Sequence, residues 1–153
     1  KDRKERVKDA VGATKAAVEE GIVPGGEVTL LRAATALDAL ALTGDEKVGL
    51  DILKISLSDP FVKLVRNSGY DEGYYLKIVS ESIEVDFGLN VLTGELGSML
   101  KFGIIDPAKV TRLALVNGAS AATMILTTEA MVTEIESKED KKTPSVPGGM
   151  DEY

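Results

Sequence analysis

The stretch from Gly103 to Arg112 places the strongest constraint on the fold of this chain. Ile104 and Ile105 are apolar and β-branched, as in a strand, and Asp106-Pro107 follows directly. Proline suits the first helical position because its missing N–H would have no partner there. An aspartate just before it can accept hydrogen bonds from the free amides of the first turn. The stretch therefore predicts a strand-to-helix junction, with the carboxylate of Asp106 at the positive end of a helix dipole.

Apolar residues recur at helical spacing on both sides of this junction. The spacing predicts helices over 1–20, 28–42, 45–57, 60–67, 71–82 and 108–127. Apolar residues cover nearly all sides of the helix at 45–57 and dominate the helix at 108–127, which predicts that both are buried. Alternation predicts a strand over 83–89, a short helix fits 93–102, and 130–135 predicts a last strand without a hairpin partner. The fold class is therefore mainly α, with a few short β-strands.

Composition narrows the chemistry. The 153 residues carry a formal net charge of -7 without a basic cluster, which argues against a nucleic-acid surface. Cysteine and histidine are both absent, which excludes disulfides, thiolate nucleophiles, imidazole bases and the usual zinc and copper sites. We find no signal-peptide core behind the charged residues 1–6 and judge no apolar run long enough to span a membrane. We therefore expect a cytoplasmic protein without a membrane partner, and a start without methionine suggests part of a longer one.

Three polar or glycine-containing positions are candidates for binding, each with a structural alternative. Counting about 100° per residue, Asp9 lies nearly opposite an apolar helix stripe, where most acids are simply solvated. Gly25-Gly26 permits close backbone approach to an anion, although a plain tight turn has the same pattern. Asn90, at a strand end, offers the donor and acceptor that read a heterocycle edge, or it bonds its own backbone in a turn.

Taken together, several runs of sequence resemble the C-terminal part of group I chaperonins, the bacterial-type, ring-forming sixty-kilodalton chaperones. The runs are Val7-Lys8-Asp9-Ala10, Ala13 through Gly26, Gly88-Leu89-Asn90 with Gly94-Glu95, Gly103 through Arg112, Thr127 through Thr133, and the short tail remnant Gly148-Gly149-Met150. Each run alone is common, and the combination is specific. The resemblance extends from the first residues to about residue 135.

The resemblance implies a domain organisation and a multihelical fold like that of the chaperonin equatorial domain. Residues 1–19 correspond to the end of the intermediate domain, residues 20–135 to the second half of the equatorial ATPase domain, and residues 136–153 to a disordered tail. Family members supply the phosphate-binding loop, a lysine and the principal magnesium acid from their N-terminal half. The resemblance therefore implies about half of a nucleotide site here, and an isolated chain that is inactive.

The resemblance also implies roles for individual residues, with ATP and Mg²⁺ as cofactors. Gly26 would lie at the nucleotide, Asp106 would bind the ribose, and Asn90, Val91 and Leu92 would face the adenine. Asp9 would be the catalytic acid on a swinging helix that reaches the magnesium and the attacking water. Glu27 departs from the pattern, because many relatives have a third glycine there.

The implied partners are those of a folding machine. They are further copies of the same chain in stacked heptameric rings, a co-chaperonin and unfolded polypeptides. The alternative is a non-enzymatic helical scaffold that acts by self-association, supported by the strongly apolar helices and by a last strand that could pair with another chain.

Overall fold

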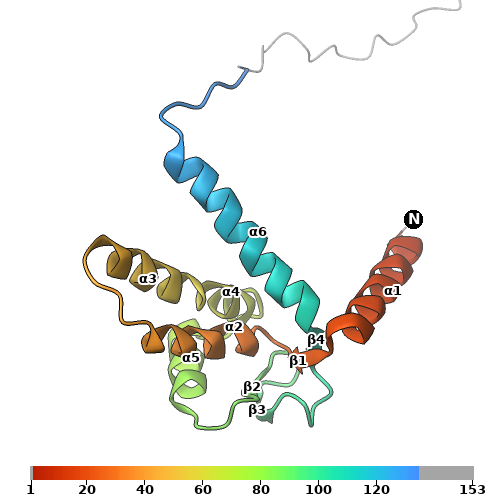
Figure 1. Cartoon of the computed structure of the whole chain (residues 1–153). Coiled ribbons are helices and arrows are strands. Elements are labelled where there is room, and N and C mark those ends of the chain that lie inside the picture. The colour runs from red at the N-terminus through yellow and green to blue at the C-terminus, as the bar shows by residue number, and fades with distance from the viewer. Residues whose placement is uncertain (1, 135–153) are drawn as a thin grey trace, which may run out of the picture.

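The computed structural model describes residues 2–134, which form helices and two small sheets (Figure 1). The elements in chain order are α1 (Asp2–Glu20), β1 (Ile22–Pro24), α2 (Val28–Ala36), the 3₁₀ turn η1 (Leu37–Ala39), α3 (Asp45–Ser56), α4 (Asp59–Asn67), α5 (Glu72–Glu81), β2 (Phe87–Asn90), β3 (Glu95–Ser98), β4 (Ile105–Pro107) and α6 (Ala108–Thr127). The expectation of a mainly helical fold with short strands is confirmed.

The two sheets are antiparallel and two-stranded, and they differ in how far apart their strands lie along the chain. β2 and β3 form a hairpin, with Leu89 opposite Leu96. β1 and β4 come from distant segments, with Val23 opposite Asp106, and they lie side by side at the base of α1 and α6 (Figure 1). The second pairing brings the segment that follows α1 onto the segment that precedes α6.

The core lies between α2, α4, α5 and the β2–β3 hairpin. Its fully buried side chains are Phe61, Leu89, Met99, Val28, Val65 and Val79. Arg32 of α2 ties this body together: one terminal guanidinium nitrogen donates to the carbonyl of Val79 at 2.7 Å and the other to that of Ser82 at 3.0 Å. These carbonyls belong to the last turn and the C-cap of α5, where helix carbonyls lack the usual intrahelical partners. Arg32 therefore closes the C-terminal end of α5 against α2.

The strand predicted over 83–89 is correct only in its second half, because the structure has strand from Phe87 to Asn90. The side chain of Ile83 is 99% exposed and that of Val85 is also exposed, so the alternation before Phe87 marks no buried face. The amide of Phe87 donates to the carbonyl of Glu84 in a turn. Alternation alone does not distinguish a half-buried strand from a turn with exposed apolar side chains.

The short helix fitted to 93–102 is wrong, since Glu95–Ser98 is strand β3. Gly94 has a φ of 78°, and its amide donates to the carbonyl of Asn90 at 2.8 Å, so the chain reverses there. The last strand predicted over 130–135 is also wrong for residues 130–134, which have no strand. Residue 135 and the tail predicted to be disordered, 136–153, lie outside the described residues.

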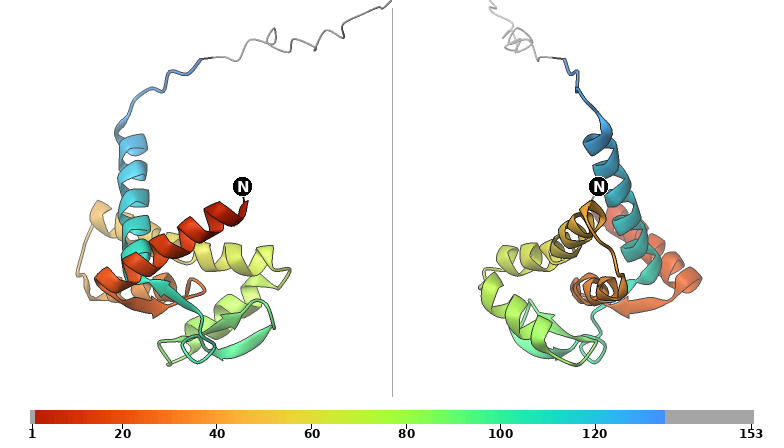
Figure 2. Two further views of the ribbon diagram at one scale, coloured as in Figure 1. Left: turned by 90° about the vertical axis from the view of Figure 1, so that its right-hand side faces the viewer. Right: turned by 60° about the vertical axis from the view of Figure 1, so that its left-hand side comes forward.

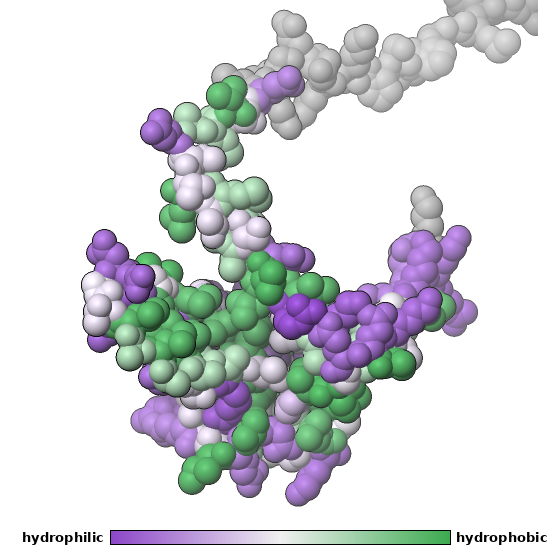
Figure 3. All heavy atoms as spheres, viewed as in Figure 1, coloured by the Kyte–Doolittle hydropathy of each residue, from purple (hydrophilic) through white to green (hydrophobic). Residues whose placement is uncertain are grey.

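The predicted burial of α3 and α6 is wrong. Neither helix contains a buried residue, and side chains such as Ile52, Ile55, Ile125 and Leu126 are exposed. α6 extends away from the body formed by α2 to α5 in all three views (Figures 1 and 2). Hydrophobic residues gather on the helical body beside the base of α6 (Figure 3). Apolar composition thus predicts a surface that favours contact, but not what covers it.

The judgement that no apolar run is long enough to span a membrane is wrong for α6. By length and composition alone, Ala108–Thr127 is long and apolar enough to cross a bilayer, and it is the one such helix among residues 2–134. The core helix of a soluble protein passes the same test, so one such helix is weak evidence for insertion.

Candidate functional site

The predicted strand-to-helix junction is confirmed, but the capping role of Asp106 is not. Asp106 lies within β4, and Pro107 occupies the N-cap position of α6 without a side-chain capping bond to that helix. Asp106 is one residue too early to cap α6, because its backbone is committed to pairing with Val23. Its carboxyl group is half-buried, and this burial raises its pKa. The carboxyl group therefore remains available to a ligand.

The Gly25-Gly26 turn packs directly on β4 and on the core. The amide of Gly25 donates to the carbonyl of Ile104 at 2.9 Å, and a Cβ on Gly25 would lie 3.0 Å from the nitrogen of Ile105. Gly26 has a φ of 68°, and a Cβ there would lie 2.6 Å from Cε of Met99. The contacts explain why two glycines stand here, and they place Gly26 close to the segment that carries Asp106.

The end of the β2–β3 hairpin approaches the same turn. The carbonyl oxygen of Leu89 lies 3.9 Å from the Cβ position of Gly26. Asn90 follows and is half-buried, and its side-chain oxygen accepts a hydrogen bond from the amide of Leu92 at 3.1 Å. The side-chain oxygen of Asn90 therefore bonds the backbone of its own turn, which is the structural alternative given above for this residue. Val91 is half-buried, whereas Leu92 is 91% exposed.

Asp9 lies in a surface cleft beside the junction between β4 and α6. A surface cleft is lined by Glu5, Lys8, Asp9, Gly12 and Ala13 of α1 together with Pro107 and Val110. Asp9 therefore shares a cleft with the residue that follows Asp106. A Cβ on Gly12 would meet no neighbouring segment within 4 Å, so this side of α1 is open. Asp9 thus lies close to the end of the strand that carries Asp106.

The base of α1 is attached to α6 beside this cleft. The guanidinium of Arg112 donates two hydrogen bonds to the carboxylate of Glu20, at 2.6 and 3.0 Å, and Lys109 pairs with Glu19. The amide of Ala108 donates to the carbonyl of Gly21 at 3.1 Å. The bond from Arg112 lowers the pKa of Glu20. These contacts set where α1, and with it Asp9, stands relative to the β1–β4 sheet.

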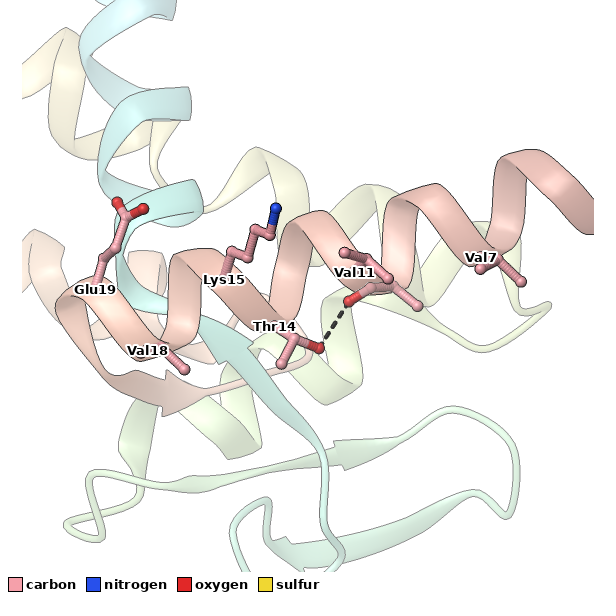
Figure 4. Close-up of a pocket in the computed structure, with 7 residues that line it drawn as sticks. Val7, Val11, Thr14, Lys15, Val18 and Glu19 are labelled. Carbon is pink, nitrogen blue, oxygen red and sulfur yellow. Dashed lines mark hydrogen bonds between the residues drawn. The ribbon is translucent and has the colours of Figure 1, made fainter.

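A second depression on α1 has a different character. Val7, Val11 and Val18 lie along it with Thr14 and Lys15, as the close-up shows (Figure 4). The hydroxyl of Thr14 donates to the carbonyl of Ala10, so it is already satisfied. An exposed valine stripe without converging polar groups favours contact with another part of a protein over small-molecule chemistry.

Glu27 is a residue of this region that the sequence analysis did not include among the candidate binding residues. It is half-buried, and burial raises its pKa, which the negative charge of Asp106 raises further. The signal available in the sequence was its position, because Glu27 directly follows two glycines in a turn, where left-handed backbone conformations occur. The carboxyl groups of Glu27 and Asp106 thus lie near each other beside the Gly25-Gly26 turn.

Comparison with known proteins assigns this arrangement to a family. Residues 1–136 match the family model described as the TCP-1/cpn60 chaperonin family. The fold is similar to an open-state monomer of a group II chaperonin from Methanococcoides burtonii, with 26% identity, a TM-score of 0.72, and 82% of this chain and 33% of that one covered. It is also similar to a group III chaperonin in the open state, with 29% identity, a TM-score of 0.78, and 86% and 28% covered.

The chain therefore spans about a third of the length of these solved relatives. The family match covers more than half of the chain and includes every candidate site residue from Asp9 to Asp106. The fold expectation of an equatorial-domain-like, mainly helical structure is confirmed by both similar structures. The chain belongs to the TCP-1/cpn60 chaperonin family.

Proposed function

We propose that this chain is the C-terminal part of an ATP-driven ring chaperonin that assists protein folding, and that it supplies about half of the nucleotide site. The observation that carries the proposal is the β1–β4 pairing, with Val23 opposite Asp106 and the turn at Gly25 bonded to Ile104. This pairing brings the glycine turn close to the half-buried carboxylate of Asp106, and the next residue, Pro107, lines the cleft that contains Asp9. A glycine turn, an acid that can bind a sugar and an acid near the phosphates are three of the parts of a site for nucleotide hydrolysis.

In this proposal each element has one task. Gly26 lets the backbone approach the nucleotide, and the carboxylate of Asp106 accepts hydrogen bonds from the ribose. The hairpin end at Asn90, Val91 and Leu92 faces the adenine, where the Asn90 amide nitrogen is free to donate while its oxygen holds the turn. Asp9 orients the attacking water and takes its proton, as general bases do.

The residues present are compatible with a Mg²⁺–ATP complex, which supplies charge neutralisation on the phosphates when bound. Magnesium is commonly bound by one or two carboxylates together with phosphate oxygens. Asp9 offers one exposed carboxylate in an open cleft, and residues 2–134 contain no cluster of three acidic groups that would form a complete metal site. The remaining ligands would come from phosphate and from the rest of the longer protein.

The domain assignment and the group are parts of the same proposal. Residues 1–19 would be the end of the intermediate domain, 20–135 half of the equatorial domain, and 136–153 a tail. We assign the chain to group I because the runs of sequence given above, including Gly148-Gly149-Met150, resemble that group. The two similar structures belong to groups II and III. Group I implies stacked heptameric rings, a separate co-chaperonin and a cytoplasmic, soluble protein. Sevenfold symmetry of the full-length protein in electron micrographs would support group I, and eightfold symmetry would contradict it.

The ribose contact gives a direct test of nucleotide binding. In the full-length protein, Asp106→Asn is expected to weaken ATP binding by about tenfold, because a hydrogen bond to a charged group contributes about 1.5 kcal/mol or more. Titration calorimetry of ATP would measure the change. Asp51→Asn, on an exposed position of α3, is the matched control and should leave the affinity unaltered. Equal affinities for the wild type and Asp106→Asn would contradict the ribose assignment.

A second function, self-association through an apolar surface, is favoured by one observation. A groove between α3 and α6 is lined by apolar side chains and small residues, including Leu30, Ile52, Leu53, Leu115, Gly118 and Leu126. Ile52 is 64% exposed and Leu126 is 84% exposed. The strand exchange expected through 130–135 loses its basis, because residues 130–134 are not a strand. The groove remains as the surface for association.

Self-association of the 153-residue chain is expected to be weak and to depend on this groove. Sedimentation velocity at rising concentration should show a growing dimer fraction, and the double variant Ile52→Glu/Leu126→Glu should abolish it, because burying an unpaired carboxylate is costly. Lys63→Glu on α4 is a surface control that should leave the dimer fraction unchanged. A monomer at every concentration would remove this candidate and leave the chaperonin proposal intact.

A further inference from the structure

Glu27 has an unusual backbone conformation for its residue type. Among residues 2–134 it is the one residue other than glycine with a positive φ, at 63° with ψ 7°. Residues with a Cβ rarely adopt this left-handed backbone conformation, whereas glycine adopts it without steric cost. Glu27 is the N-cap residue of α2, yet its side chain makes no capping bond to that helix. Helix capping therefore does not explain why a glutamate stands at this position.

The carboxyl group of Glu27 lies in the candidate nucleotide site. The Pro24–Glu27 turn follows β1, whose Val23 pairs with Asp106, and the turn is bonded to Ile104 through the amide of Gly25. Within the described part of the chain, the side chains of Glu27 and Asp106 form neither a hydrogen bond nor an ion pair with another protein group. Both are half-buried. The site thus contains two neighbouring acceptors without protein donors.

The pKa directions agree with this geometry. Burial raises the pKa of both carboxyl groups, and the charge of Asp106 raises that of Glu27 further, since no cation among the described residues offsets these effects. A ligand that offers hydroxyl donors would relieve this cost, whereas an anionic group would increase it. The 2′ and 3′ hydroxyls of a ribose are adjacent donors and therefore match two adjacent carboxylates.

We propose that Glu27 is a specificity-determining residue of the nucleotide site, which together with Asp106 accepts the hydrogen bonds of the two ribose hydroxyls. The proposal rests on the proposed ATP-binding function and adds the sugar selectivity of that site. Removal of the 2′ hydroxyl leaves a half-buried carboxylate without a donor. A site built around hydrogen bonds rejects an analogue that lacks one of them. The chain therefore discriminates ATP from 2′-deoxy-ATP more strongly than a site with glycine at this position.

The test compares ATP with 2′-deoxy-ATP in the full-length protein and in two variants of Glu27. Glu27→Gly removes the carboxylate and suits the left-handed backbone, so it is expected to fold at least as stably. Glu27→Gln keeps the size of the side chain and removes its charge. Titration calorimetry is expected to show that the preference for ATP falls about tenfold in Glu27→Gly, as the loss of one hydrogen bond to a charged group predicts, and by less in Glu27→Gln.

Controls separate this inference from the function on which it rests. Glu46→Gln, on the first turn of α3, should retain the wild-type preference for ATP. ATP binding with the same preference in the wild type and in both Glu27 variants would overturn the role of Glu27 and leave the nucleotide site standing. A wild-type protein that binds neither nucleotide would overturn the proposed function itself, and the sugar selectivity with it.

Discussion

Asp9→Ala in the full-length protein is expected to lower the rate of ATP hydrolysis by about 100- to 1,000-fold while ATP still binds, because a positioned general base contributes about that much. Asp9 is exposed on α1, on the side that opens onto Pro107 and Val110 of the junction. Among the described residues, the ion pairs that join α1 to α6 lie at the C-terminal end of α1, so movement of α1 can bring the carboxylate toward the phosphates. Single-turnover hydrolysis and a separate ATP-binding titration measure the two effects.

Glu5→Ala is the matched control for Asp9→Ala. Glu5 lines the same cleft, but its carboxylate is paired with Lys8 at 3.0 Å, so its loss should change hydrolysis less than about twofold. The 153-residue chain alone is expected to show no turnover above its own Asp9→Ala variant, since the proposed function places about half of the site outside these residues. Equal hydrolysis rates for the full-length wild type and Asp9→Ala would refute the catalytic role.

Gly88→Ala is expected to lower the free energy of unfolding of the chain by about 2–3 kcal/mol, as overpacking of a dense core does. A Cβ on Gly88 would lie 2.5 Å from Cγ2 of Val28, 2.8 Å from Sδ of Met99 and 2.9 Å from its Cγ. Val28 is β-branched and fully buried, so it has little freedom to move aside. Because Val28 follows Glu27 directly, the displacement should also reach the glycine turn. Urea unfolding followed by circular dichroism measures the change.

Gly118→Ala provides the comparison for Gly88→Ala. Gly118 lies in α6, where an added Cβ would meet no neighbouring segment within 4 Å, so alanine enters open space and favours the helix. Its free energy of unfolding should stay equal to that of the wild type or rise by up to about 1 kcal/mol. If both variants unfolded at the same urea concentration, the close packing of β2 against α2 would not be a determinant of stability.

Much of the local structure could be predicted because helices and their ends depend on nearby residues. The helices that contain Asp9 and Phe61, and the change from strand to helix near Pro107, follow from apolar spacing and from proline and glycine positions. The site was less predictable. Asp106 and Gly26 lie far apart along the chain, and only the pairing of β1 with β4 brings their segments together. The resemblance to chaperonins predicted that Asp106 and Gly26 belong to one site. The spacing of residues along the chain did not predict it.

The sequence by itself determined the helical character of the chain, the junction at Asp106-Pro107 and the presence of a turn at Gly25-Gly26. These properties depend on backbone preferences and apolar periodicity, which act over a few residues. The tertiary structure decided that residues 87–98 form a hairpin, that α3 and α6 expose their apolar faces, and that Glu27 lies beside Asp106. These properties depend on which distant surfaces meet, and periodicity records only that a residue is apolar, not what it will contact.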